Sequence, residues 1–290
     1  MGGNVQSAFC PREQDMDYKT VMVGLALDRP NDACLAVVGD IAERFGARVI
    51  GVAASDITPT LYFAEGDLAQ QLLDEEAAAI RTRLSELEAE FRNAIEKRAA
   101  SVEWRSAQAL SGPYLLQQSR AADLLVVGAR SEAIVDIGIA ADPGDLLMQA
   151  GRPVVVVPST AKWLDLRSVL VAWKDVREAR RAVFDALPLL AAAKDVTIAA
   201  IPEKQGDRTE ILAQVSDVAA WLRGHGIVAS TVVPEKVTDP IAQLDKVAAD
   251  IEAGVVIAGA YGHSRLREWI LSGVTRHLAT ESRRCAFLSR

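Results

Sequence analysis

The sequence predicts an α/β protein built from two tandem units, each with a five-stranded, mostly parallel sheet. Three observations lead to this prediction. Apolar runs of strand length alternate with segments of helical periodicity, which is typical of parallel strands whose connecting helices cover both faces of the sheet. The whole cycle restarts at Val169. The chain of 290 residues also suits two domains of ordinary size.

The first unit begins with an apolar run over residues 21–27, which predicts a buried strand. A helix follows, because Pro30 suits a helix start and apolar positions recur at helical spacing up to Gly46. Residues 67–99 contain neither Gly nor Pro and predict a helix of about 30 residues. The other elements expected in this unit are strands at 48–53, 102–107, 123–128 and 153–158 and helices at 113–121 and 143–150.

The second unit repeats this order of elements. The segments that end at Gly128 and Gly259 read AADLLVVG and EAGVVIAG and lie 131 positions apart (259 minus 128). At the start of the units the offset is 148 (169 minus 21), so the first unit is longer by 17 residues (148 minus 131). The elements expected in the second unit are strands at 169–173, 196–201, 227–233, 255–259 and 284–289, helices at 178–193, 208–223 and 240–252, and a last helix near Gly273.

The repeat divides the chain into domains. We expect a disordered extension at residues 1–15, a first domain at 16–158, a linker at 159–166 and a second domain at 167–290.

The charge balance narrows the classes of function. A net charge of -7 argues against sequence-independent binding of nucleic acid, which depends on clustered Lys and Arg. The acidic surplus lies in the first half. The modestly basic second half favours either a small anionic ligand or ordinary solvated surface charge. No apolar stretch approaches the roughly 20 residues that span a membrane, so we expect no membrane contact and a cytoplasmic location.

Residue types that carry metal or covalent chemistry are sparse. Cys10, Cys34 and Cys285 are an odd set without metal-ligand spacing, which indicates buried thiols in a reducing compartment. The three histidines lack the acidic spacing of a metal site. The sequence contains no Walker A motif, nucleophile elbow or G-x-G-x-x-G motif, so enzymatic activity is disfavoured.

A candidate phosphate-binding segment follows the fourth strand of the second unit. Gly259 and Gly262 form a G-x-x-G pattern. Nine residues separate Gly262 from the sequence SGVT at 272–275, where a helix is expected to begin. Glycines let backbone amides come close to an anion, and a helix start adds N–H groups and the positive end of its dipole. His263 and Arg265 either contact phosphates or belong only to the loop surface.

This spaced pattern resembles the universal stress protein (UspA) family, whose motif is G-x-x-G, nine residues, then Gly and Ser or Thr. The resemblance covers residues 18–290. It implies Rossmann-like, adenine nucleotide alpha hydrolase-like domains and ATP or another adenine nucleotide as ligand. It also implies that the fifth strands, at 154–157 and 285–288, pair within the chain as a pseudo-dimer, with homodimer formation left open. The phosphate contacts that the resemblance implies are Gly259, Gly262, Ser272, Gly273, Val274 and Thr275.

The sequence departs from the family pattern at one important place. Nucleotide-binding members have an Asp after the first strand, near the adenine or ribose, whereas the aligned residue is Lys174. Asp175 is adjacent, but consecutive strand residues face opposite ways, so it replaces that carboxylate only if the chain bends.

The first unit departs further. Ser131 replaces the second glycine, and Asp142 stands where Gly273 stands in the second unit. The residue that aligns with Lys174 is Ala26, with Asp28 two residues later. A carboxylate at Asp142 would occupy the place of a phosphate, so we expect this copy not to bind nucleotide.

Two functions follow from these features. In the first, the protein is a stress-response protein that binds an adenine nucleotide in its second domain. In the alternative, both sites are empty and the chain is a structural or interaction protein. A slow ATP hydrolase would require a base to orient water, and no residue stands out for that role.

Overall fold

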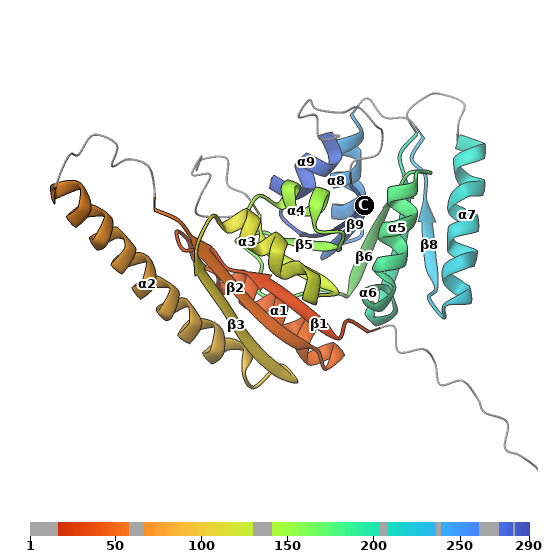
Figure 1. The fold of residues 1–290 in the computed structure, drawn as a ribbon. Coiled ribbons are helices and arrows are strands. Elements are labelled where there is room, and N and C mark those ends of the chain that lie inside the picture. Colours follow the sequence, from red (N-terminus) through yellow and green to blue (C-terminus); the bar gives the residue numbers. More distant parts are fainter. Residues whose placement is uncertain are drawn as a thin grey trace, which may run out of the picture.

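The computed structural model describes residues 17–57, 67–129, 141–202, 208–235, 239–260, 273–280 and 282–290. Within these residues, ten strands form one sheet in the order β3-β2-β1-β4-β5-β10-β9-β6-β7-β8. The second half of this order mirrors the first, since β6 to β10 repeat the roles of β1 to β5. The predicted fold class, two parallel α/β units in tandem, is confirmed (Figure 1).

The elements are best given unit by unit. The first unit contains β1 (Thr20–Gly24), α1 (Asp32–Phe45), β2 (Arg48–Ser55), α2 (Asp67–Ile95), β3 (Ser101–Gln108), α3 (Ser111–Gln118), the 3₁₀ turn η2 (Ser119–Ala121), β4 (Leu124–Gly128), α4 (Pro143–Gln149) and β5 (Val154–Val157). The second contains β6 (Ser168–Trp173), α5 (Arg177–Asp185), α6 (Leu187–Ala192), β7 (Asp195–Ala200), α7 (Arg208–Gly224), β8 (Ala229–Val232), α8 (Pro240–Asp250), β9 (Val255–Gly259), α9 (Gly273–Thr280) and β10 (Cys285–Ser289).

Local sequence explains where several of these elements stop. Gly46 ends α1 in a left-handed conformation, with φ of 59°, and its N–H donates to the carbonyl of Ala42. The single helix predicted at 178–193 is wrong, because α5 and α6 meet at Ala186. Pro188 lies in the first turn of α6, where it has no N–H to continue the hydrogen-bond ladder of α5.

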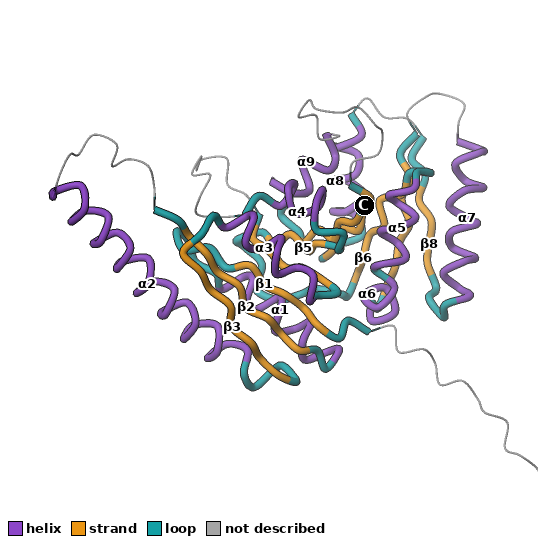
Figure 2. The backbone as a smooth tube through the Cα atoms, viewed as in Figure 1, coloured by secondary structure: helices purple, strands orange, loops and turns teal. Residues whose placement is uncertain are grey.

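Helices cover both faces of the sheet (Figure 2). Side chains of α1, α2, α5, α6 and α7 share one core with one face of the strands. Side chains of α3, α4, α8 and α9 share a second core with the opposite face. Inner strands between these layers, such as β4, β5 and β10, are buried on both sides, which explains their continuous apolar runs, whereas the edge strands β3 and β8 are partly exposed.

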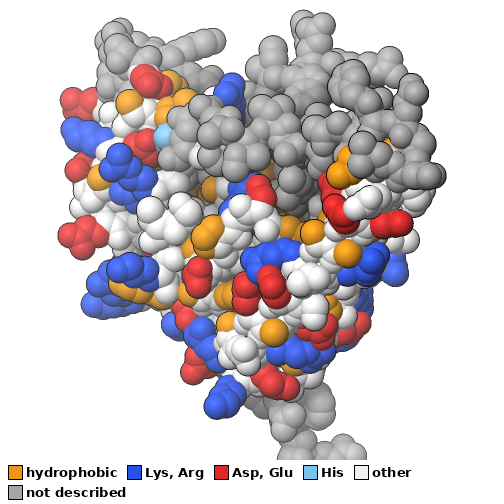
Figure 3. All heavy atoms as spheres, turned by 90° about the vertical axis from the view of Figure 1, so that its left-hand side faces the viewer, with side chains coloured by type: hydrophobic (Ala, Val, Ile, Leu, Met, Phe, Trp, Pro, Cys, Tyr) orange, Lys and Arg blue, Asp and Glu red, His pale blue; other side chains and the backbone are white. Residues whose placement is uncertain are grey.

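One face of the molecule shows a mixed distribution of charge (Figure 3). On the face of the molecule that bears α2, Lys and Arg are interspersed with Asp and Glu (Figure 3). None of the helices in the described residues combines the length and apolar character needed to cross a membrane.

The two units join through antiparallel pairing of β5 with β10. Val154 lies opposite Leu288, and Val155 opposite Phe287, whereas the other strand pairs within the described residues are parallel. All four residues of β5 are buried. The pairing of fifth strands that the family resemblance implied is therefore confirmed.

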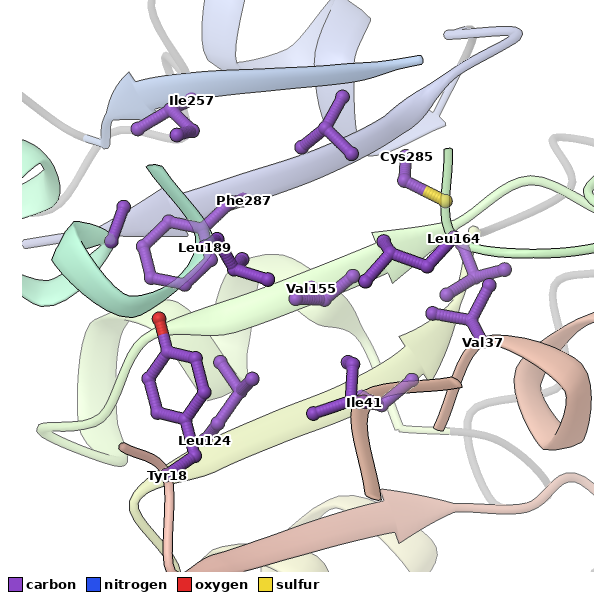
Figure 4. Close-up of a cluster of buried hydrophobic side chains, with 14 of the residues drawn as sticks. Tyr18, Val37, Ile41, Leu124, Val155, Leu164, Leu189, Ile257, Cys285 and Phe287 are labelled. Carbon is purple, nitrogen blue, oxygen red and sulfur yellow. The ribbon is translucent and has the colours of Figure 1, made fainter. Parts of the chain in front are cut away.

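Side chains from both units pack together over this junction (Figure 4). Tyr18, at the start of the first unit, donates its hydroxyl to the backbone carbonyl of Asp185 at 2.7 Å. Burial, with a smaller effect of the Asp185 charge, raises the pKa of Tyr18 well above its ordinary value. The thiols of Cys34 and Cys285 lie in the same core, where burial raises the pKa of each to about 12.

The segment that connects the units packs against both of them. Leu164 and Leu166 are buried, and the Leu164 N–H donates to the Asp40 carboxylate of α1 at 2.6 Å. On the other side, a Cβ placed on Gly254 would lie 2.3 Å from the carbonyl oxygen of Asp165. The connection is thus part of the packed structure.

Candidate functional site

The candidate site lies beyond the carboxyl ends of β6 and β9. These strands are neighbours in the sheet, although β7 and β8 separate them in sequence, so the strand order reverses between them. In parallel α/β sheets, ligands bind at such a reversal. Gly262, His263, Arg265 and Ser272 of the predicted loop lie outside the described residues. The structure places Gly259 at the end of β9 and three further residues on the first turn of α9, namely Gly273, Val274 and Thr275.

Gly259 is required by close packing. A Cβ at this position would lie 2.4 Å from the backbone nitrogen of Ala179 and 2.5 Å from the carbonyl carbon of Glu178. The first turn of α5 therefore rests directly on the end of β9. Sequence reasoning assigned this glycine to phosphate contact alone and missed its role against α5, which no local motif signals.

The start of α9 carries the remaining described residues of the motif. Gly273 is its first residue and is exposed, while Val274 packs against the neighbouring core. Thr275 is buried, with 1% of its surface exposed. A Cβ on Gly273 would approach the flexible Cδ1 of Ile241 at 3.1 Å, so space for a side chain exists at modest cost.

The same position in the first unit is built differently. Asp142, which aligns with Gly273, is the N-cap of α4. Its Oδ1 accepts hydrogen bonds from the backbone N–H groups of Gly144 at 2.8 Å and Asp145 at 3.2 Å. The helix start in this unit is thus occupied by the protein's own carboxylate.

The segment after β6 brings positive charge to the site. Lys174 and Asp175 are both exposed, and the Asp175 carboxylate forms an ion pair with Arg180 of α5. A tight bend is present, since the Val176 N–H lies 2.7 Å from the carbonyl of Lys174. The Asp175 carboxylate is therefore engaged by α5.

In the corresponding segment of the first unit, a side chain that the sequence analysis did not single out holds the loop after β1. Asn31 is buried, and its amide accepts from the Ala26 N–H at 2.9 Å and donates to the Ala26 carbonyl at 2.9 Å. Asn31 stands at the N-cap of α1, where Asn is favoured, but its side chain makes no cap hydrogen bond, so that preference does not signal the contact with Ala26. This clamp ties the end of β1 to the start of α1.

One buried polar group at the end of β6 lacks a hydrogen-bond partner among the described residues. Trp173 is the last residue of β6 and is 8% exposed, and its indole N–H has no hydrogen-bond partner in the described part of the chain. Leaving such a donor unpaired costs about 1–3 kcal/mol. No group of three or more potential metal ligands is found among the described residues.

Comparison with known proteins identifies the fold. No protein-family model and no curated protein matches this sequence. A universal stress protein from Archaeoglobus fulgidus DSM 4304 is similar in structure, with a TM-score of 0.69 at 15% identity, over 94% of this chain and 98% of that one. A proposed universal stress protein from Pseudomonas aeruginosa UCBPP-PA14 has a TM-score of 0.62 at 14% identity, over 95% and 94%. A functionally unknown protein from Pseudomonas aeruginosa PAO1 has a TM-score of 0.58 at 13% identity, over 95% and 93%. In its fold, therefore, the chain is a tandem UspA-like protein.

Proposed function

We propose that this chain is a cytoplasmic, universal stress protein-like stress-response protein that binds an adenine nucleotide in its second domain, residues 167–290. The phosphates are held by residues 259–275. The observation that carries the proposal is the difference between the two helix starts, α4 and α9. One is capped by an aspartate of the protein, and the other begins with a glycine.

The first unit supplies an internal reference for an anion at this place. Two backbone amides at the start of α4 already hold a carboxylate, that of Asp142, with hydrogen bonds of 2.8 and 3.2 Å. Gly273 contributes no carboxylate at the equivalent position. The positive end of the α9 dipole then favours an external anion, and a phosphate has the required charge and acceptor oxygens.

The phosphates should dominate the affinity. Lys174 replaces the family's aspartate near the adenosine, and the Asp175 carboxylate is paired with Arg180. The binding energy that remains comes from the amides of the loop and helix start and from positive charge. Affinity should therefore fall in the order ATP, ADP, AMP.

A carboxylate introduced at Gly273 provides the test. Gly273→Asp would supply the cap that Asp142 supplies in the first unit, so it should reduce ATP affinity at least about tenfold, because a like charge competes with the phosphate. Gly273→Ala adds the Cβ without the charge and should retain most of the affinity. Calorimetric titration with ATP measures both.

Two loop variants assign the site to one unit. Gly262→Asp should abolish ATP binding, and the matched Ser131→Asp in the first unit should leave it unchanged. Loss of binding in Ser131→Asp would move the site to the first unit. Absence of heat with wild-type protein at millimolar ATP, ADP and AMP would overturn the proposal.

The alternative function is that of a structural or interaction protein without nucleotide. Lys174 at the usual aspartate position favours it, as does the packing of α5 on Gly259, which explains that glycine without a ligand. The same titrations decide between the two functions.

A further inference from the structure

A small pocket lies at the junction of the two units. It has a volume of about 240 Å³ and is lined by Leu147, Met148, Gly151 and Arg152 of the first unit and by Arg177 and Arg290 of the second. These are far apart in sequence, and the antiparallel pairing of β5 and β10 brings them together. The beginning of β5 and the end of β10 share one edge of the sheet, where Figure 1 shows the chain end C between α4 and α5.

Three arginine residues line this pocket, called here the arginine pocket. Within the described residues, neither Arg152 nor Arg290 has an acidic partner, and Arg290 Nη1 instead donates to the sulfur of Met148 at 3.0 Å. Arg177 pairs with Glu178 at 3.2 Å, but 76% of its side chain stays exposed. The whole chain carries a net charge of -7, so the collection of positive charge here is local.

The backbone adds to this positive potential. Arg177 is the first residue of α5, a helix of nine residues whose N-cap, Val176, has an apolar side chain and makes no side-chain cap. The positive end of the helix dipole therefore lies at the backbone of Arg177. Cations held close together repel each other, and a bound anion relieves that repulsion.

We infer that the arginine pocket binds an oxyanion of the phosphate class. Guanidinium groups form paired, charge-assisted hydrogen bonds with phosphate oxygens, and the pocket brings three arginines from the two units to one place. The volume of about 240 Å³ lies below the roughly 300–1,000 Å³ of pockets for drug-sized ligands, so the pocket suits a phosphate or pyrophosphate more than a whole nucleotide. The site does not depend on the loop proposed to hold a nucleotide.

Titration of the full chain with pyrophosphate in low-salt buffer tests the inference. Arg152→Glu and Arg290→Glu should each weaken binding at least about tenfold, because each replaces a charge-assisted donor with a like charge. Arg223→Glu, at an exposed site on α7, makes the same change of net charge and should stay within about twofold. If a glutamate variant lacks a native melting transition, Arg152→Ala replaces it in the titration, because it removes the donor without adding a negative charge.

Additional titrations distinguish a free anion from the phosphates of a nucleotide, and they test the pocket and the nucleotide site separately. Gly262→Asp should retain pyrophosphate binding. If ATP does not compete with pyrophosphate, the ligand of the pocket is a free anion. If ATP competes, the ligand is the phosphate tail of a nucleotide. No pyrophosphate binding by wild-type protein, or equal weakening by Arg152→Glu and Arg223→Glu, overturns the inference. Pyrophosphate binding without ATP binding overturns only the nucleotide proposal.

Discussion

At the scale of single residues, the glycines that end β4 and β9 show how one position in a repeat can serve different contacts. Gly128 has room for a side chain, since a Cβ there would lie 3.6 Å from the Cys34 sulfur, an ordinary contact. Gly259 has none, because the backbone of α5 comes within 2.4 Å of the same point. The sequence aligned these glycines correctly, but the contact that separates them comes from a helix some 80 residues away.

The two glycines predict opposite outcomes for the same substitution. Gly259→Ala should lower the free energy of unfolding by about 1–3 kcal/mol, as overpacking does when backbone must move. Gly128→Ala should be neutral or stabilise by up to about 1 kcal/mol, since alanine loses less backbone entropy on folding. Urea unfolding measures both. Equal effects of the two substitutions would show that α5 does not press on β9 as described.

At the scale of elements, the sequence predicts most of the fold because its signals are local. Gly46 ends α1 as its backbone preference requires, and Pro143 begins α4 just inside the helix start. The break between α5 and α6 was missed, although Pro188 marked it, because the apolar pattern continues through the break. The sequence predicted a carboxylate at Asp142 where the helix begins, and the structure places it there as the N-cap of α4, whereas the Asn31 clamp depends on contacts across a loop.

The cap of α4 gives a prediction at this scale. Asp142→Ala should lower the free energy of unfolding by about 0.5–2 kcal/mol, because two backbone N–H groups lose their acceptor. Asp142→Asn keeps an oxygen acceptor of similar capping strength and should cost less. Thermal unfolding of both variants measures the difference. An alanine variant as stable as wild type would mean that water replaces the carboxylate without loss.

At the scale of the whole molecule, one sheet spans both units and shares its core across β5 and β10. The sequence contained the repeat that makes this possible, and the family resemblance supplied the pairing. The contacts that fix the join were not predictable from either half alone. The hydrogen bond from Tyr18 to Asp185 and the convergence of Arg152, Arg177 and Arg290 both depend on how the halves meet.

Separated units should re-form this join. A fragment of residues 17–158 would expose the edge of β5, and one of 167–290 the edge of β10, and unpaired apolar edges favour association. Each fragment should self-associate, and a mixture should form a one-to-one complex, measurable by light scattering and native mass spectrometry. Fragments that fold but stay monomeric when mixed would show that the strand pairing contributes little.

The packed connection at residues 159–166 has a consequence for stoichiometry. Two separate chains that pair through their fifth strands come apart on dilution, whereas a short connection keeps the partner at an effective concentration in the millimolar range. Each molecule therefore always combines one aspartate-capped helix start with one glycine helix start. If the second unit holds a nucleotide as proposed, the chain is limited to one bound nucleotide at any protein concentration.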